Sequence, residues 1–585
     1  MNETSPSSSS ETDIVLEPGN PGSSESAETA VDACLEVLQN EDLVYLILKM
    51  LCESFETSHI SAISGPSQWK RHLLPLVLVT PFFKAATDMI WEHMHCLLPV
   101  FSLLPSFKAE ATGYSFGGIT DDEWSSGFYL YTEKVKQFTF TSPCVFEEIS
   151  QSWLSFLLIE SLKRPFFPSL KSFTLLHGAQ SALKILPMTI HPAFQSLDMQ
   201  LRSIMNTTAV PKDWETEGEG DSGIDPFVSS VASLTSQLKK LRYRGPLTDS
   251  SLISISRLKK LHSLSLTPTT PCTYNELPRK LKNLTELRDL TIAVHRPQSD
   301  PPTCPNYKYP SGGHLRLTSI SLTGKAWSIC CLVSQLSPTT LVRFRACVTD
   351  IGNGGPLKKQ LAIVLSRNKA LQHLTVSSFQ PLVARTRNCT YSSLPDSPEF
   401  DLLTKLPSSI RSGLQEVDIT GIPIFSTSDI RLAVTRCLQH YPDASLIKFR
   451  FHIPKPLRKD EDEAFLPTWD TLSFIALEGS KTLRHLELQL QTACFQQPPT
   501  IPPGFSDHGL QHLFIVTDDP SLNLSFHDKI AIAVFIDHLF PHLQSVGGTA
   551  EEEWGMINAL VLSYQERRLA ALERYRQESQ GKEQR

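Results

Sequence analysis

The sequence predicts an α/β solenoid, in which a small all-helical unit is followed by an irregular array of strand-and-helix repeats curved into a horseshoe, and then by a C-terminal capping helix. Three observations predict this fold. Apolar residues near the N-terminus recur at three- and four-residue steps, a six-residue apolar motif returns fourteen times through the middle of the chain, and a helical pattern follows the last motif. The chain has 585 residues, 41% of them hydrophobic, which is enough to bury a sizeable core.

We divide the chain into four parts. Residues 1–30 are rich in Ser, Thr, Pro and Glu and predict a disordered tail, because little apolar material offsets the entropy of ordering them. Residues 31–105 are expected to form the helical unit and residues 106–550 the repeat array. Residues 551–585 are expected to form the capping helix and a tail.

The helical unit contains two apolar stretches. A helical pattern starts near Val31, and a polar loop is expected at about residues 53–67. The strongly apolar segment 69–98 predicts one or two buried helices. Pro81 favours a kink or a boundary between them, because proline and the residue before it fit poorly inside a helix.

The repeat array is predicted from the motif apolar-x-x-apolar-x-apolar, usually with Leu in the first position. Its fourth and sixth positions alternate along a strand and face a core that one strand cannot bury alone, so neighbouring repeats must stack. Many intervals are close to the roughly 20–29 residues of a leucine-rich repeat. Candidate helices between strands lie at 357–366, 430–440 and 528–539. The alternative is an antiparallel sheet protein of another kind. The motif begins at Val135, Leu170, Phe194, Leu238, Leu261, Leu287, Leu317, Leu341, Leu371, Leu414, Leu446, Leu483, Leu510 and Leu543.

The capping helix is predicted from a shared apolar face after residue 550. Trp554, Ile557, Val561 and Tyr564 lie on this face, and three glutamates open the helix, where they complement the positive end of its dipole. Such a helix would cover the open end of the solenoid.

Two N-terminal stretches, taken with the array that follows them, resemble the F-box/leucine-rich-repeat family, in particular its fungal-type members. The first stretch is Leu38-Gln-Asn-Glu-Asp-Leu43 with Leu46, Ile47, Leu48 and Leu51. The second is Leu76-Val-Leu-Val79 with Phe82, Phe83 and Trp91. The chain differs from the family pattern at Gln39, which replaces the usual proline, and at Thr80, which replaces the usual cysteine.

The resemblance implies a non-catalytic substrate-recognition subunit of an SCF-type (Skp–cullin–F-box) ubiquitin ligase. The helical unit would bind a Skp-type adaptor, and through it a cullin, while the array would bind a target protein. The alternative for any one of the contact residues is that it only forms the core of the unit. The implied adaptor contacts are Leu43, Leu46, Ile47, Leu76, Val79, Phe82, Phe83 and Trp91.

Basic residues outnumber acidic ones at the outward positions of the motifs, which predicts an acidic or phosphorylated target. The alternative is that these charges only keep the strand surface solvated. The candidate target-binding residues are Lys239, Lys240, Arg242, Arg244, Arg343 and Arg345.

Other function classes find little support in the sequence. A net charge of −7 argues against nucleic-acid binding through overall charge. None of the common nucleophile, nucleotide or zinc motifs occurs, so no enzyme, metal or cofactor is expected. The apolar run at 73–83 is too short to span a bilayer, and no signal peptide is evident, so we expect a cytoplasmic or nuclear protein without a membrane partner. The alternative function is a leucine-rich-repeat scaffold or inhibitor that acts without a ligase.

Overall fold

The computed structural model describes the helical unit, the repeat strands and the C-terminal helix. The described residues are 39–58, 68–79, 82–95, 97–110, 113–116, 120, 122, 128–140, 159–161, 163–176, 193–200, 228–229, 231–233, 235, 237–245, 247–268, 276–294, 316–336, 338–350, 361, 363–364, 366–378, 413–420, 446–452, 467–479, 481–491, 494–495, 499–500, 508–517 and 522–583. The tail predicted at 1–30 and the helix predicted at 430–440 lie outside them, as does part of the helix predicted at 357–366.

Three helices form the N-terminal unit: α2 (Glu41–Ser58), α3 (Gln68–Val77) and α4 (Phe83–Glu92). Asn40 caps α2, because its side-chain oxygen accepts hydrogen bonds from the backbone N–H groups of Asp42 and Leu43 at 3.1 and 3.2 Å. Helix α2 includes residues 53–58, where the sequence predicts a loop, since no glycine or proline ends it there. Helix α3 ends at Val77 and α4 begins at Phe83, so two separate helices form, while Pro81 itself lies outside the described residues.

The helical unit has a core of its own, separate from that of the sheet. Tyr45 of α2 donates a hydrogen bond to Glu92 of α4 at 2.9 Å. Burial, together with this bond, raises the pKa of Tyr45 to about 12. The residues of this small core are Val44, Leu48, Leu73, Ala85, Ala86 and Met89.

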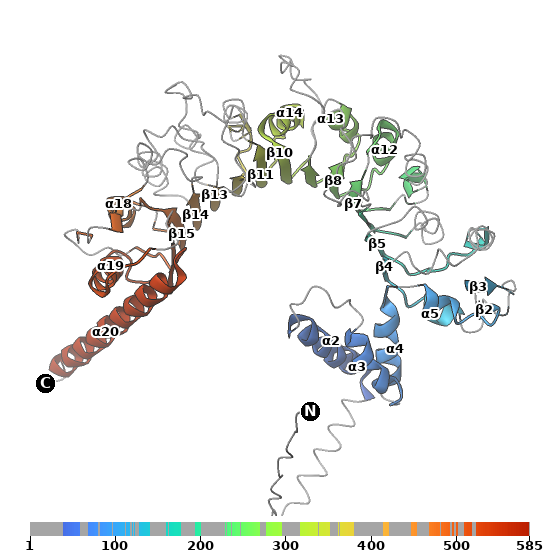
Figure 1. The fold of residues 1–585 in the computed structure, drawn as a ribbon, viewed down its shortest axis with the longest axis horizontal. Helices are drawn as coiled ribbons and strands as arrows, with labels where there is room; N and C mark the ends of the chain where they lie inside the picture. Colours follow the sequence, from blue (N-terminus) through green and yellow to red (C-terminus); the bar gives the residue numbers. More distant parts are fainter. Residues whose placement is uncertain are drawn as a thin grey trace, which may run out of the picture.

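The main sheet has fifteen strands in the described part of the chain, all parallel, and each is hydrogen-bonded to its neighbours in chain order. The sheet is open and lines the inner side of an arch, with the helices between the strands, such as α12 (Asp249–Ile255), α13 (Glu276–Leu281) and α14 (Ala326–Leu336), outside it (Figure 1). The strands are β1 (His93–Met94), β4 (Gln137–Phe140), β5 (Ser172–Leu176), β6 (Ser196–Gln200), β7 (Lys240–Gly245), β8 (Ser263–Pro268), β9 (Asp289–Ala293), β10 (Ser319–Lys325), β11 (Arg343–Asp350), β12 (His373–Ser378), β13 (Glu416–Thr420), β14 (Lys448–His452), β15 (His485–Gln489), β16 (His512–Val516) and β17 (Ser545–Gly548).

Each of the fourteen predicted motifs gives one strand, which begins two residues after the first motif position. The parallel ladder confirms the solenoid and shows that the antiparallel alternative is wrong for this sheet. An antiparallel pair does occur apart from it, in the hairpin of β2 (Phe107–Glu110) and β3 (Gly113–Phe116). Strand β1 has no motif, so the sheet begins inside the range 31–105 that we assigned to the helical unit.

The first, fourth and sixth motif positions are buried, as the alternation predicts. In the motif of β7 these are Leu238, Leu241 and Tyr243, all of which lie in the core. The parallel register places like positions side by side, so Phe138 and Phe173 stack with ring centroids 5.6 Å apart. Repetition of this contact from strand to strand builds one continuous core.

Helices on the convex side complete the repeats. Two of them begin at side-chain caps: Thr248 accepts a hydrogen bond from the N–H of Ser251, and Ser525 from that of Asp528. The last helix before the cap matches the one predicted at 528–539. These elements are α5 (Leu98–Phe101), α7 (Tyr129–Thr132), α12 (Asp249–Ile255), α13 (Glu276–Leu281), α14 (Ala326–Leu336), α18 (Trp469–Glu478) and α19 (Phe526–Leu539).

Helix α20 (Glu551–Glu583) closes the C-terminal end of the sheet, as predicted. Trp554 is fully buried against the last strand, where a Cβ at Gly548 would lie 2.2 Å from its ring, so this close approach requires glycine. Asn558 accepts a hydrogen bond from the N–H of Val546 at 2.8 Å. The helix therefore covers an edge strand that would otherwise be open to pairing with another chain.

Candidate functional site

The outward side chains of the sheet form rows across its concave face, because neighbouring strands are in register. We call two of them the first and second rows. The first row is Lys240, Ser263, Asp289, Ser319, Arg343, His373, Glu416, Lys448, His485, His512 and Ser545. The second row, two residues further along each strand, is Arg242, Ser265, Thr291, Ser321, Arg345, Thr375, Asp418, Arg450, Glu487, Phe514 and Gly547.

The predicted target-binding residues lie on this face, but the structure separates them into two groups. One group is Lys239, just before β7, with Lys240, Arg242 and Arg244 on β7, and the other is Arg343 and Arg345 on β11. Strands β8, β9 and β10 lie between the groups. Four strand spacings place β7 and β11 about 19 Å apart.

The basic residues of β7 and β11 are exposed and weakly paired. Arg242 lies 3.6 Å from Asp198, and Arg343 lies 3.9 Å from Asp289. Burial raises the pKa of Asp198, while Arg242 partly offsets this shift. Exposed pairs at these distances contribute little free energy. Within the described part of the chain Arg345 has no acidic partner, so β7 and β11 carry positive charge that is free to attract an anion.

The strands nearer the C-terminus carry charges that are already compensated. Lys448 pairs with Glu416 at 2.8 Å, and its hydrogen bond lowers the pKa of that carboxyl group. Arg450 pairs with Glu487 and also lies 3.3 Å from Asp418. Burial raises the pKa of Asp418 despite this arginine. This part of the concave face therefore offers less free charge than β7 and β11.

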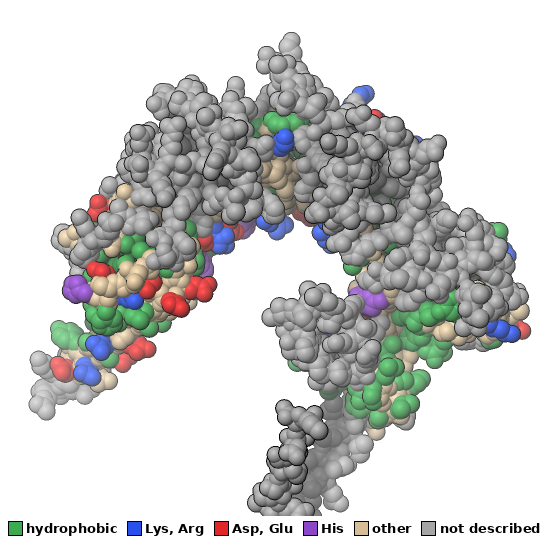
Figure 2. Space-filling model, in the orientation of Figure 1, with side chains coloured by type: hydrophobic (Ala, Val, Ile, Leu, Met, Phe, Trp, Pro, Cys, Tyr) green, Lys and Arg blue, Asp and Glu red, His purple; other side chains and the backbone are tan. Residues whose placement is uncertain are grey.

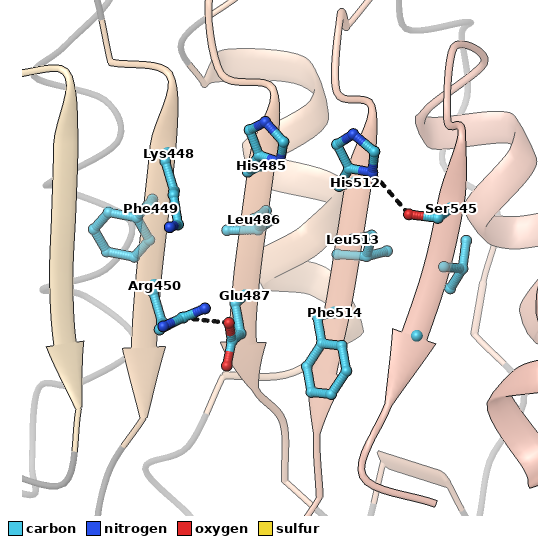
Figure 3. A pocket seen from close by; sticks show the side chains of 12 residues that line it. Lys448, Phe449, Arg450, His485, Leu486, Glu487, His512, Leu513, Phe514 and Ser545 are labelled. Atoms are coloured by element: carbon cyan, nitrogen blue, oxygen red, sulfur yellow. Dashed lines mark hydrogen bonds and ion pairs between the residues drawn. The ribbon is translucent and has the colours of Figure 1, made fainter. Parts of the chain in front are cut away.

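A hollow of about 230 Å³ lies on β14–β17 (Figure 3). His485 and His512 stack along one side of it with ring centroids 4.4 Å apart, and Nδ1 of His512 lies 2.8 Å from Oγ of Ser545. Phe514 lies on the same strand as His512, further toward the end of that strand (Figure 3). The hollow is smaller than the roughly 300–1,000 Å³ typical of small-molecule sites. No cluster of three or more potential metal ligands is found among the described residues.

Desolvation lowers the pKa of His485, and the neighbouring His512 and Lys448 add to the shift. His485 therefore resists protonation in the folded chain. His485 and His512 lie far apart in the sequence and are brought together only by the pairing of β15 with β16, so sequence spacing does not predict their stacking.

The helical unit exposes apolar side chains outside its own core. Leu43, Leu46, Ile47 and Met50 follow helical spacing along α2, and Leu46 is 51% exposed. We call the exposed set the apolar face, and Figure 2 shows hydrophobic side chains at the surface of this end of the molecule. The apolar face consists of Leu43, Leu46, Ile47, Met50, Leu74, Leu78, Val79 and Phe83.

Five of the eight predicted adaptor contacts belong to the apolar face, namely Leu43, Leu46, Ile47, Val79 and Phe83. The other three are partly buried. Leu76 and Phe82 pack on the small core. Trp91 packs on the core of the sheet and lies 4.9 Å from Tyr131, centroid to centroid.

Sequence reasoning did not select Met50, Leu74 and Leu78 as contacts. Leu78 is 88% exposed. For Met50 the signal was present in the spacing, because it follows Leu46 by four residues on the same side of α2. Leu78 lies just beyond the end of α3, so helical spacing does not place it.

No protein-family model matches the chain, and no curated protein matches it. Among solved structures, an internalin from Listeria monocytogenes aligns with 78% of this chain and 91% of its own, at 12% identity and a TM-score of 0.29. A chain of the yeast Rad7–Elc1 complex aligns over 87% of this chain and 98% of its own length, at 14% identity and a TM-score of 0.30. A leucine-rich-repeat protein from Leptospira interrogans aligns over 71% of this chain and 90% of its own length, at 13% identity and a TM-score of 0.26. Such low TM-scores mean that the backbones do not superpose closely, so the solenoid fold follows from this chain's own strands.

Among the described residues, no helix is both long and apolar enough to cross a lipid bilayer.

Proposed function

We propose that the chain is the substrate-recognition subunit of an SCF-type ubiquitin ligase. The helical unit binds a Skp-type adaptor, which connects it to a cullin, and the concave face binds a target protein. The chain itself is a receptor and catalyses no step. The observation that carries the proposal is the apolar face on a helical unit that already has a separate core.

Large apolar side chains exposed together on a small unit favour a docking role. Full burial of a Leu, Ile or Phe side chain is worth about 1.5–3 kcal/mol, so several of them supply enough free energy for a stable complex. Helical spacing of the anchors suits a groove between helices of a partner. The alternative, that these residues only form the core of the helical unit, accounts well for Leu76 and Phe82. It does not explain why Leu46 and Phe83 are exposed.

The weakly paired cations of β7 and β11 support an acidic or phosphorylated target. Carboxylates and phosphates accept paired hydrogen bonds from arginine, which makes Arg242 and Arg345 suitable contacts. Solvation alone would require only some charge on these strands. It would not explain why charge is left free here and compensated on β13–β15.

Co-expression with a Skp-type adaptor tests the proposal. The full chain is expected to co-purify with the adaptor through gel filtration. A variant with Leu46→Asp and Phe83→Asp is expected to lose the adaptor, because both substitutions place charge on the apolar face while leaving the small core intact.

Leu572→Asp is the matched control, since Leu572 is equally exposed but lies on α20, far from the helical unit. It is expected to retain the adaptor. Failure of the unsubstituted chain to co-purify, under conditions where an established F-box protein does, would contradict the proposal. The differences at Gln39 and Thr80 would then favour a ligase-independent repeat scaffold or inhibitor.

A further inference from the structure

The strip of concave face between β7 and β11 is lined by short side chains, and we call this strip the trough. Its floor is formed by the outward positions of β8, β9 and β10, which are half-buried. Most of them carry hydroxyl groups, and the one long side chain among the outward positions of these three strands is Lys325, at the end of β10. The other positions are Ser263, Ser265, Thr267, Asp289, Thr291, Ala293, Ser319, Ser321 and Thr323.

Long basic side chains rise on both sides of this floor. Lys240, Arg242 and Arg244 stand on β7, Arg343 and Arg345 stand on β11, and all of them are exposed. Lys and Arg side chains are visible along the inner edge of the arch in Figure 2. The concave face therefore carries short side chains on β8–β10 between two strands that carry long basic ones.

The width of the trough suits one α-helix. Its two rims are about 19 Å apart at the backbone. A helix with its side chains is about 10–12 Å across, which leaves room for the Lys and Arg side chains on either side. Serine and threonine hydroxyls below it offer hydrogen bonds to polar side chains on the lower surface of such a helix.

The charge of the trough specifies the chemistry of the occupant. Asp289 is the acidic residue among the floor positions, and it lies near Arg343, so the positive charge of both rims dominates. Arg288 adds a further exposed cation at the end of the trough where β9 begins. Acidic residues are therefore favoured on both flanks of the bound helix rather than on one.

We propose that the trough binds an α-helix of the target protein that carries Asp or Glu along two flanks and lies along β8–β10 between the basic rims. This inference rests on the target-binding role proposed for the concave face. It adds the form of the target, which is helical, and the placement of its charges.

A labelled synthetic peptide provides the probe for binding to the full-length chain. The peptide is alanine-based, about 20 residues long so that it is helical in water, and carries glutamates in two stripes. One comparison peptide replaces each glutamate with glutamine, and another places a proline in the centre to break the helix. Fluorescence anisotropy measures the three dissociation constants at low salt. Only the helical acidic peptide is expected to bind.

Thr291→Trp is the decisive variant, because it fills the centre of the floor without changing any charge. It is expected to weaken binding of the acidic helix at least about tenfold. Thr375→Trp is its matched control, since Thr375 lies in the same row on β12, one strand outside the trough. This control is expected to bind within about twofold of the unsubstituted chain.

A second filling variant, Ser321→Trp, repeats the test on β10, and thermal unfolding of each variant shows that it is folded. Equal binding by Thr291→Trp or Ser321→Trp and the unsubstituted chain would overturn the proposal and leave only general attraction between charges. Equal binding of the glutamine or proline peptide would also overturn it.

The experiments distinguish a wrong assignment of the trough from a wrong assignment of the ligase role. Adaptor co-purification depends on α2–α4 and uses no peptide. Loss of adaptor binding with intact peptide binding would contradict the ligase role alone. Intact adaptor binding without peptide binding would contradict the trough alone.

Discussion

Asn368 shows how a single buried side chain joins two repeats. Its Nδ2 group donates a hydrogen bond to the carbonyl of Val364 at 2.7 Å, and its Oδ1 atom accepts one from the N–H of Leu341 at 2.9 Å. Leu341 is the first motif residue of the preceding strand. A fully buried polar side chain is therefore used here to satisfy the backbone between repeats.

Asn368→Ala is expected to destabilise the fold by about 1–3 kcal/mol, because it leaves the N–H of Leu341 buried without an acceptor. Urea unfolding measures the loss. Asn283→Ala is the control, since Asn283 occupies an exposed turn and its side chain makes no hydrogen bond within the described part of the chain. Equal stability of the two variants would show that the Asn368 bonds contribute nothing net.

His485 is expected to make the stability of the folded chain depend on pH. Its pKa is lowered in the folded chain by desolvation, with His512 and Lys448 adding to the shift and Glu416 opposing it. The unfolded chain, with an ordinary histidine pKa of about 6.5, takes up a proton that the folded chain resists. The stabilisation from neutral His485 is thus present above about pH 6.5 and is lost as the pH falls below it.

His485→Gln is expected to lessen the fall in melting temperature between pH 7.5 and pH 5.5, because glutamine does not titrate. All other groups are shared by the two proteins, so the difference between their pH profiles reports on this histidine. Parallel profiles would contradict the assignment of the shift to His485.

At the scale of elements, α20 acts as a cap only through its first half. Trp554, Ile557 and Val561 are buried, and Arg568 pairs with Asp537 of α19 at 2.7 Å. Described side chains after Arg568 are exposed. Trp554→Ala is expected to lower the free energy of unfolding by about 3–5 kcal/mol. Truncation of the chain after Arg568 is expected to leave the melting temperature nearly unchanged. A large loss on truncation would mean that the second half of α20 also contributes to the fold.

The strands could be predicted because their signal is local. Each motif carries its apolar positions within six residues, and one core requires the same pattern in every repeat. Strand β1 has no such signal, because it consists of only His93 and Met94, which pair with β4, and two residues are too few to carry the six-residue motif. Helix α2 extends past the predicted boundary because its end depends on the absence of breakers rather than on an apolar period.

The binding surfaces could be predicted only in part, because they depend on distances between repeats. The sequence shows that Lys240 and Arg343 point outward, but only the ladder places three strands between them. In the same way, the partners that compensate Arg450 come from β13 and β15. In the helical unit, spacing alone does not separate exposed Phe83 from partly buried Phe82.

At the scale of the whole molecule, the arch leaves two surfaces open at once. The helical unit lies at the N-terminal end, while strands β8 and β10 lie near the middle of the arch (Figure 1). Stacked repeats contact mainly their neighbours, so substitutions at one surface are expected to leave the other unchanged. This separation suits a receptor that holds an adaptor and a target together.

Calorimetric titration of a Skp-type adaptor into the full-length chain tests whether the apolar face binds an adaptor. We predict one-to-one binding with a negative heat-capacity change, the mark of buried apolar surface, and no binding by the Leu46→Asp, Phe83→Asp variant. Absence of binding by the unsubstituted chain, or equal binding by the variant, would contradict the assignment of the apolar face to an adaptor.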